Sequence, residues 1–197
     1  MARPSKLAHV VYMTRRYEEM LAWYKTVFEA TPQYENPAFA FLTYDDEHHR
    51  YAFANMSALD PDSVDQPLPS GMGLNHIGYT FADAGELLET YERLKLAGIE
   101  PYWEVHHGVT LSVYYQDPDG NRMEFQADRF ASAAEANAFM LSDAFAANPI
   151  GIDVDFEELL ERYRNGASVA ELMTQPQGPM SALPPEHGMS ASVTVTR

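Results

Sequence analysis

The sequence predicts an α+β fold built from two βαβββ modules, because a strand-like segment recurs and the same pattern follows it each time. LAHVVYMT at residues 7–14 and LNHIGYTF at residues 74–81 share Leu, His and Tyr at positions 67 residues apart. Each copy precedes a stretch with helical apolar spacing and then several short alternating stretches typical of strands. We therefore expect two copies of one module, followed by a tail of different character.

The first module is predicted to span residues 5–55. Residues 7–14 alternate as a strand does, with His9 on the same face as other side chains of odd number. A helix is predicted next, ending before Pro32, from an apolar stripe formed by Tyr17, Met20, Leu21, Tyr24, Val27 and Phe28. Three short strands complete the predicted module, at residues 33–35, 38–44 and 50–54.

A linker and the second module follow. Residues 56–73 are rich in Pro, Ser, Asp and Gly and show no periodicity, which is typical of a linker. The second module is predicted over residues 74–128. Its helix begins with a D-x-x-E capping box formed by Asp83 and Glu86, and a strand near residues 101–105 comes after it. The order of elements therefore repeats that of the first module.

The second module ends in a predicted hairpin, TLSVYYQDPDGNRMEFQ at residues 110–126. Pro118 suits the second position of a turn and Gly120 supplies a positive φ, so a tight turn is predicted at residues 117–121. Alternation then places Glu124 on the face that should point into the fold. A carboxylate at an interior position needs a partner, and our interpretation is that it binds a metal ion.

The tail, residues 129–197, has a different character. Short helices are predicted near residues 133–146, 156–165 and 169–173, because three helix-start signatures precede them. These signatures are Ser132 with Glu135, Asp155 with Glu158, and Ser168 with Glu171. The closing segment SASVTVTR fits either an edge strand or a disordered end, and His187 is assigned no role.

Composition limits the partners of this chain. Its 197 residues carry a formal charge of −16, which repels nucleic acid and anionic membrane surfaces, so neither is expected as a partner. The absence of Cys excludes disulfides and thiolate metal sites, which leaves His, Asp and Glu as ligands. No apolar run approaches the roughly 20 residues of a membrane span, and MARPSKLAHV lacks a signal-peptide core, so a cytoplasmic location is expected.

The repeat brings three candidate ligands into one pattern. His9 and His76 occupy equivalent positions in the two modules and are expected to face a common interior with Glu124. Two imidazoles and one carboxylate form the facial set used by non-haem Fe(II) oxygenases. Aligning RYAF with RMEF places Ala52 where the first module would have supplied a further carboxylate. The two modules are thus expected to form one mixed-sheet, metal-binding cavity.

Five motifs occur in order over residues 5–128: LAHV, HHRYAFA, LNHIGYTF, HHGVTLSVYY and DPDGNRMEF. Together they resemble the vicinal oxygen chelate superfamily and, within it, the short type I extradiol catechol dioxygenases with one pair of modules. The resemblance implies Fe(II)-dependent ring cleavage of a substituted catechol, such as a 2,3-dihydroxybiphenyl, with dioxygen as second substrate. It assigns the metal to His9, His76 and Glu124.

The same resemblance implies three catalytic residues. His49 is the acid/base histidine, and Tyr114 and His107 contact the catechol oxygens or the bound oxygen. The choices between His48 and His49 and between His106 and His107 stay open. Strand alternation from Ala52 would turn His49 away from the interior, so a bulge or a strand start is expected to redirect it.

Two other functions suit the same fold. A glyoxalase-like isomerase or transferase would normally require a carboxylate where Ala52 stands. A metal-free protein of the bleomycin-resistance type, which sequesters a ligand, would have no need for the set of His9, His76 and Glu124. Paired modules also leave sheet edges exposed, so a homo-oligomer is expected.

Overall fold

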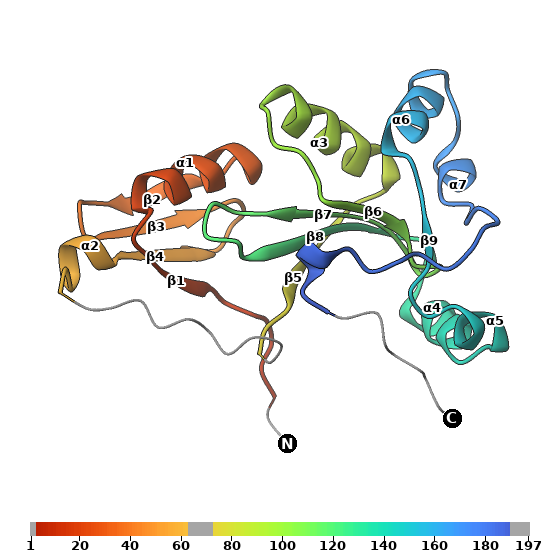
Figure 1. Ribbon diagram of the computed structural model, residues 1–197, viewed down its shortest axis with the longest axis horizontal. Helices are drawn as coiled ribbons and strands as arrows, with labels where there is room; N and C mark the ends of the chain where they lie inside the picture. The colour runs from red at the N-terminus through yellow and green to blue at the C-terminus, as the bar shows by residue number, and fades with distance from the viewer. Residues whose placement is uncertain (1–2, 63–72, 190–197) are drawn as a thin grey trace. The chain divides into compact units, whose positions relative to one another are not determined.

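The computed structural model describes residues 3–62 and 73–189. The chain divides into two compact units, each with its own mixed sheet (Figure 1). Unit 1 comprises residues 1–68 and 117–121, and unit 2 comprises residues 69–116 and 122–197. Most of the predicted linker and the segment SASVTVTR lie outside the described residues.

Unit 1 contains a four-stranded sheet in the order β1-β4-β3-β2. Its strands are β1 (Val10–Thr14), β2 (Thr31–Glu35), β3 (Phe39–Thr43) and β4 (Tyr51–Asn55). β1 runs parallel to β4, while β3 is antiparallel to both β2 and β4. The helices are α1 (Tyr17–Val27), between β1 and β2, and α2 (Met56–Leu59), after β4.

The core of unit 1 follows from the stripe predicted for α1. Tyr24 is fully buried, and its ring lies 4.6 Å from that of Tyr51 and 4.9 Å from that of Phe53, both in β4. Pro32 does not mark the helix end, because α1 already ends at Val27 and Pro32 lies inside β2. Proline is tolerated there because β2 is an edge strand.

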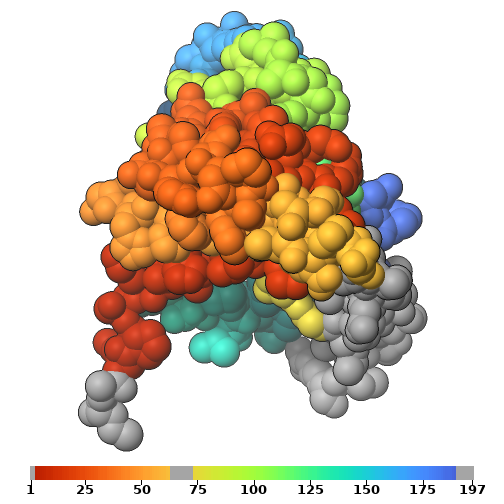
Figure 2. Space-filling view, turned by 90° about the vertical axis from the view of Figure 1, so that its left-hand side faces the viewer, coloured from red at the N-terminus to blue at the C-terminus, as the bar shows by residue number. Residues whose placement is uncertain are grey.

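The β2 edge of unit 1 is exposed along its whole length. Figure 2 shows the surface of unit 1, with the residues that follow α1 in orange. An open edge strand offers unpaired N–H and C=O groups to another chain. The homo-oligomer expected from the sequence stays a prediction, and β2 is the strand on which to test it.

Unit 2 repeats the topology of unit 1 and adds one strand, in the order β5-β8-β7-β6-β9. The strands are β5 (His76–Phe81), β6 (Trp103–His106), β7 (Thr110–Gln116), β8 (Arg122–Asp128) and β9 (Ile152–Asp153). β5 runs parallel to β8, as β1 does to β4, and the remaining pairs are antiparallel. The α+β class with two mixed sheets is therefore confirmed.

The predicted turn before β8 forms as expected. The Asp117 side chain accepts hydrogen bonds from the backbone N–H of Asp119 at 3.0 Å and of Asn121 at 2.9 Å, and Gly120 has φ of +84°. β7 and β8 then pair in a register that sets Tyr114 directly opposite Glu124. Directly opposed residues share one face of a sheet, so this register places the hydroxyl and the carboxylate together.

Two helices cover one face of the unit 2 sheet. α3 (Ala84–Leu96) and α6 (Phe156–Arg164) lie side by side over one face (Figure 1), and Tyr91 donates a hydrogen bond to Glu157 at 2.7 Å. The other described elements of the tail are α4 (Ala133–Met140), α5 (Asp143–Ala147), α7 (Val169–Leu172) and the 3₁₀ helix η1 (Pro185–His187). Within the described ranges, no helix is long and apolar enough to cross a membrane.

In the tail, the predicted helix starts are confirmed, but one predicted helix is divided in two. The single helix predicted over residues 133–146 is wrong, because Ser142 caps a second helix by accepting a hydrogen bond from the N–H of Phe145 at 3.3 Å. The caps predicted at Ser132, Asp155 and Ser168 are confirmed. β9 and η1 were not predicted, since two or three residues carry no periodic signal.

Candidate active site

A polar face crosses β7 and β8 of unit 2. Thr110, Ser112 and Tyr114 alternate along β7, and all three are buried. Glu124 lies opposite on β8 and is only 8% exposed. A buried carboxylate is unfavourable unless nearby groups compensate for its lost hydration. The groups around Glu124 therefore define the site.

His76 is one of those groups. It begins β5, and its Nε2 lies 3.1 Å from Glu124 Oε2. The other ring nitrogen, Nδ1, lies 2.8 Å from Asn75 Oδ1, an atom that only accepts hydrogen bonds. Burial acts to raise the pKa of Glu124, but the hydrogen bond with His76 and the electrostatic effect of the His107 ring outweigh it, so the pKa is lowered. The carboxyl group is accordingly ionised at neutral pH.

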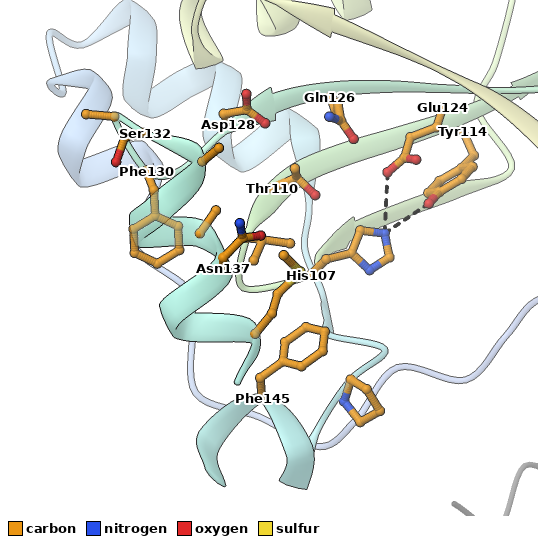
Figure 3. Close-up of a pocket in the computed structure, with 16 residues that line it drawn as sticks. His107, Thr110, Tyr114, Glu124, Gln126, Asp128, Phe130, Ser132, Asn137 and Phe145 are labelled. Carbon is orange, nitrogen blue, oxygen red and sulfur yellow. Dashed lines mark hydrogen bonds and ion pairs between the residues drawn. The ribbon is translucent and has the colours of Figure 1, made fainter. Parts of the chain in front are cut away.

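His107 is the second. Its Nε2 lies 3.0 Å from Tyr114 Oη and 3.7 Å from Glu124 Oε1 (Figure 3). Its Nδ1 contacts the carbonyl oxygen of Ile150, so this nitrogen carries the proton and donates. Burial lowers the pKa of His107, and burial together with the Glu124 charge raises that of Tyr114. At neutral pH the Tyr114 hydroxyl therefore donates to an uncharged imidazole.

His106 lies elsewhere, although it is the adjacent residue. It is 1% exposed, and its Nδ1 accepts the backbone N–H of Gly108 at 3.0 Å. Its Nε2 then donates to the carbonyl oxygen of Met173 at 3.1 Å. Both nitrogens are satisfied by backbone groups, and burial lowers the pKa of His106 to about 4. Of the two histidines, His107 is the one beside Tyr114 and Glu124.

A cavity of about 610 Å³ opens beside these residues. One wall is the polar sheet face, with His107, Tyr114 and Glu124. The opposite wall comes from the tail, and Figure 3 shows Phe130 and Phe145 among its side chains. The cavity is therefore polar on one side and mainly apolar on the other, which is the usual character of a small-molecule site.

The other predicted histidines belong to unit 1. The rings of His9 and His49 have centroids 4.6 Å apart, and His48 Nδ1 lies 2.6 Å from His49 Nδ1. His49 precedes β4 instead of lying in it, so strand alternation does not set its direction. Burial lowers the pKa of His49, and the charges of His48 and His9 act in the same sense. The structure thus pairs His49 with His9, whereas the joining of His9 with His76 and Glu124 stays a prediction.

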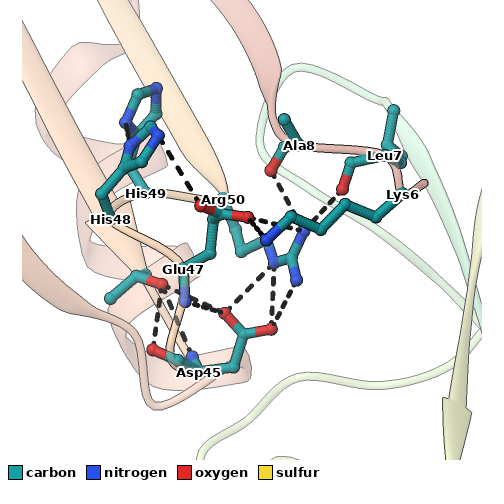
Figure 4. A network of polar contacts seen from close by, with 9 residues as sticks. Lys6, Leu7, Ala8, Asp45, Glu47, His48, His49 and Arg50 are labelled. Carbon is teal, nitrogen blue, oxygen red and sulfur yellow. Dashed lines mark hydrogen bonds and ion pairs between the residues drawn. The ribbon is translucent and has the colours of Figure 1, made fainter. Parts of the chain in front are cut away.

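Arg50 organises this part of unit 1, a role that the sequence did not reveal. Its guanidinium donates to the Asp45 carboxylate at 2.9 and 3.1 Å and to the carbonyl oxygens of Leu7 at 2.6 Å and Ala8 at 3.1 Å (Figure 4). These bonds tie the chain just before His9 to the turn that carries His49. The HHR run contains the relevant signal, but only the fold shows what the arginine contacts.

His187 was also missed as part of the site. It is 2% exposed, and its ring centroid lies 5.2 Å from that of Tyr114 and 5.6 Å from that of His76. Its Nδ1 lies 3.2 Å from Tyr102 Oη. The sequence assigned His187 no role, but the structure places it beside Tyr114 and His76, because η1 folds back against this part of unit 2.

Residues 6–125 match the model of the Glyoxalase/Bleomycin resistance protein/Dioxygenase superfamily. The chain belongs to this superfamily. It is 45% identical to biphenyl-2,3-diol 1,2-dioxygenase 2 of Rhodococcus globerulus, over 79% of this chain and 80% of that protein. It is 39% identical to biphenyl-2,3-diol 1,2-dioxygenase 3 of the same organism, over 86% of this chain and 88% of that protein.

A solved structure agrees on the fold of this superfamily member. Lactoylglutathione lyase from Agrobacterium tumefaciens matches with a TM-score of 0.50 at 19% identity, over 64% of this chain and 96% of that one. At this identity the likeness concerns the fold alone.

His76 and Glu124 are the side chains of unit 2 that could bind a metal ion together. Across residues 3–62 and 73–189, no group of three or more His, Cys, Asp or Glu side chains is arranged to hold one. The pair His76 and Glu124 nevertheless fits as part of a set. Two ligands on adjacent positions of an octahedral ion, each bonded at about 2.1 Å, lie about 3 Å apart, and the observed separation is 3.1 Å. Asn75 also accepts the second ring N–H of His76, as outer partners of metal-bound histidines do.

Proposed function

We propose that this chain is an Fe(II)-dependent extradiol dioxygenase that cleaves the ring of a catechol such as biphenyl-2,3-diol. One observation carries the proposal: the buried Glu124 carboxylate faces His76 on one side and the His107–Tyr114 pair on the other. The proposed metal ligand pair and the proposed proton-transfer pair thus share the Glu124 carboxylate, which lines the cavity. The two dioxygenase relatives, at 45% and 39% identity, support the same reaction.

His76 and Glu124 would hold the metal, with His9 as the third ligand predicted from the repeat. Fe(II) in such a site supplies coordination of the catechol oxygens and electron transfer to dioxygen. Two neutral imidazoles and one carboxylate leave a net positive charge on the ion, which favours an anionic catecholate. Burial of Glu124 removes competing water from that interaction.

Tyr114 and His107 would take part in proton transfer from the catechol hydroxyl groups. The Ile150 carbonyl holds the Nδ1 proton of His107, so Nε2 is an acceptor at the cavity and takes the hydrogen bond of the Tyr114 hydroxyl. A catechol hydroxyl at that point can give its proton to Nε2, and Tyr114 can then donate its own hydrogen bond to a substrate oxygen. His49 of unit 1 is the further acid/base candidate, on the strength of the motif resemblance.

The tail suggests which catechols fit. The apolar wall of the cavity comes from α4, α5 and the segment before α4. Its side chains are Phe130, Ala136, Met140 and Phe145. An aryl or alkyl substituent can lie against this wall while the hydroxyl groups point at Glu124. We therefore favour an aryl-substituted catechol over catechol itself.

The two rival functions have less support. The isomerase-type metal set needs a carboxylate at position 52, where this chain has alanine. Ala52 is 6% exposed and pairs with Val11 and Phe41. A metal-free sequestering protein has no need of a buried carboxylate facing an imidazole. Metal content separates the three functions, since the proposal requires about one iron per chain.

The test is direct. The purified chain is loaded with Fe(II) without oxygen, freed of excess metal and mixed with biphenyl-2,3-diol in air. A yellow ring-opened product and the matching uptake of dioxygen are expected. Retained iron with no product and no oxygen uptake from any of several substituted catechols would contradict the proposal.

A further inference from the structure

We propose that Asn75 is a positioning residue for His76 and that the C-terminal segment at residues 184–188 holds Asn75 in its working orientation. The inference rests on the proposed function in one respect, namely that His76 binds the metal. It gives residues 184–188 a role in orienting the proposed metal ligand His76.

Two hydrogen bonds carry this inference. Asn75 Nδ2 donates to the backbone carbonyl oxygen of His187 at 2.8 Å, and Asn75 Oδ1 lies 2.8 Å from His76 Nδ1. A backbone carbonyl only accepts, so the amide nitrogen must face His187 and the amide oxygen must face His76. Asn75 therefore holds a proton on His76 Nδ1, and Nε2, the nitrogen 3.1 Å from Glu124 Oε2, is left as the one that would bind a metal ion. His187 thereby selects the tautomer that a metal requires.

The segment is fixed on several sides. Gln116 Nε2 donates to the carbonyl oxygen of Glu186 at 3.2 Å, and Arg122 Nε donates to the same oxygen. The His187 ring packs edge-on against Trp103, with centroids 5.0 Å apart. Gly188 closes η1 with φ of +71°, a conformation that favours glycine. Since Gln116 and Arg122 flank the turn of the hairpin that carries Glu124, the segment contacts the elements of both proposed metal ligands of unit 2.

This arrangement couples two distant parts of the sequence. Asn75 and His187 are 112 positions apart, yet one amide group joins them. If the segment orders His76 for the metal, then the metal must stabilise the segment by the same free energy, because binding linkage is reciprocal. In a chain that keeps the Asn75 amide, metal affinity and protection of residues 185–188 are therefore expected to change together.

Asn75→Ala is the first test, with Co(II) as the probe and the full chain as the protein. Co(II) binding is followed by its visible absorption and measured by competition with a chelator, so no turnover is needed. We expect the affinity to fall by about 10–100-fold, the range for loss of an outer partner of a metal-bound histidine. Asn165→Ala, at an exposed asparagine of unit 2, is the matched control and should leave the affinity unchanged.

Asn75→Asp separates orientation from general damage. The carboxylate keeps an acceptor for His76 Nδ1–H but loses the donor to His187. We expect Co(II) affinity within about threefold of wild type, because the outer acceptor is retained, together with faster hydrogen exchange at residues 187 and 188. An Asp variant as weak as the Ala variant would overturn the positioning role.

Hydrogen exchange of the wild-type chain tests the coupling. Co(II) should slow exchange at the N–H groups of His187 and Gly188, which bond to Pro184 and Pro185, and Asn75→Ala should abolish this slowing. Equal protection with and without Co(II), or wild-type affinity in Asn75→Ala, would overturn the inference.

These outcomes are independent of ring cleavage. A wild-type chain that binds Co(II) but opens no catechol contradicts only the proposed function, whereas a chain that binds no metal contradicts both.

Discussion

The two units have the same strand order but differ at one equivalent pair of residues. In unit 1, Val11 of β1 pairs with Ala52 of β4. In unit 2, Gly78 of β5 pairs with Glu124 of β8. A Cβ added to Gly78 would lie 3.6 Å from Glu124 Oε2, so the missing side chain leaves room for the carboxylate. Unit 1 thus pairs a valine with an alanine. Unit 2 pairs a glycine, which has no side chain, with the glutamate of the candidate site.

The difference extends to the surroundings. His9 and His48 of unit 1 are exposed, whereas Glu124, Tyr114 and His187 of unit 2 are buried. Unit 2 achieves this with elements that unit 1 lacks, namely β9 and the tail helices. The comparison teaches that a duplicated module can keep its hydrogen-bond topology while one copy acquires the enclosure that a buried carboxylate needs.

Glu124→Ala should have the largest effect, because it gives β8 the residue that β4 has. Loss of a metal ligand is expected to cost more than the about 100-fold upper range for outer partners, so bound iron and ring cleavage should both fall below about 1% of wild type. Metal analysis and oxygen uptake measure this. Glu161→Ala, an exposed glutamate of α6, is the control. Stoichiometric iron in the Glu124→Ala chain would remove the contrast between the units.

Tyr114→Phe tests the polar face without touching the metal ligands. The loss of the hydroxyl that contacts His107 should lower kcat by about 100-fold, the lower end for acid–base groups, while iron content stays at wild-type level. Tyr115→Phe is the matched control, since its buried hydroxyl has no hydrogen-bond partner among the described residues. Equal loss in both variants would mean that Tyr114 acts only through packing.

Buried His106 gives unit 2 a pH dependence of its stability. A pKa of about 4 in the folded chain means that only the unfolded chain binds this proton between about pH 6.5 and pH 4. Stability is therefore complete above the unfolded pKa and is lost as the pH falls. From about pH 7.5 to about pH 5, His106 should account for roughly 2 kcal/mol of lost unfolding free energy.

Urea titrations of the wild-type and His106→Gln chains at both pH values measure this loss. The substitution should flatten the pH dependence of the unfolding free energy. An unchanged slope in His106→Gln would assign the acid sensitivity to other groups.

Gly78→Val should have the smallest effect of the set. It places the unit 1 residue opposite Glu124, where its methyl groups would crowd the carboxylate, and we expect metal affinity to fall by about tenfold. Gly78→Ala adds only the Cβ at ordinary contact distance and should behave as wild type. Chelator competition compares the two variants, and equal affinities would show that the size of residue 78 does not matter.

Much of the architecture could be predicted because its signals are local. The turn before β8 depends on Asp117, Pro118 and Gly120, which act within five positions, and it placed Tyr114 opposite Glu124 correctly. The break between α4 and α5 was missed although Ser142 stands in the sequence, because continuous helical residues surround it.

Other features could not be predicted, because they depend on contacts between distant residues. His106 and His107 are adjacent and chemically identical, and only their distances to Met173 and Ile150 distinguish them. His187 lies in a segment of Pro and Gly with no periodicity, yet it reaches Asn75. Long-range hydrogen bonds of this kind leave no pattern in a single sequence.

The contact between Asn75 and His187 also has a consequence for biosynthesis. A ribosome releases the chain from its N-terminus, so all the predicted metal ligands emerge well before residue 187 does. Until then Asn75 lacks the carbonyl that orients its amide, and His76 is free to adopt either tautomer. A nascent chain that has not yet released residue 187 would therefore hold metal more weakly than one that has.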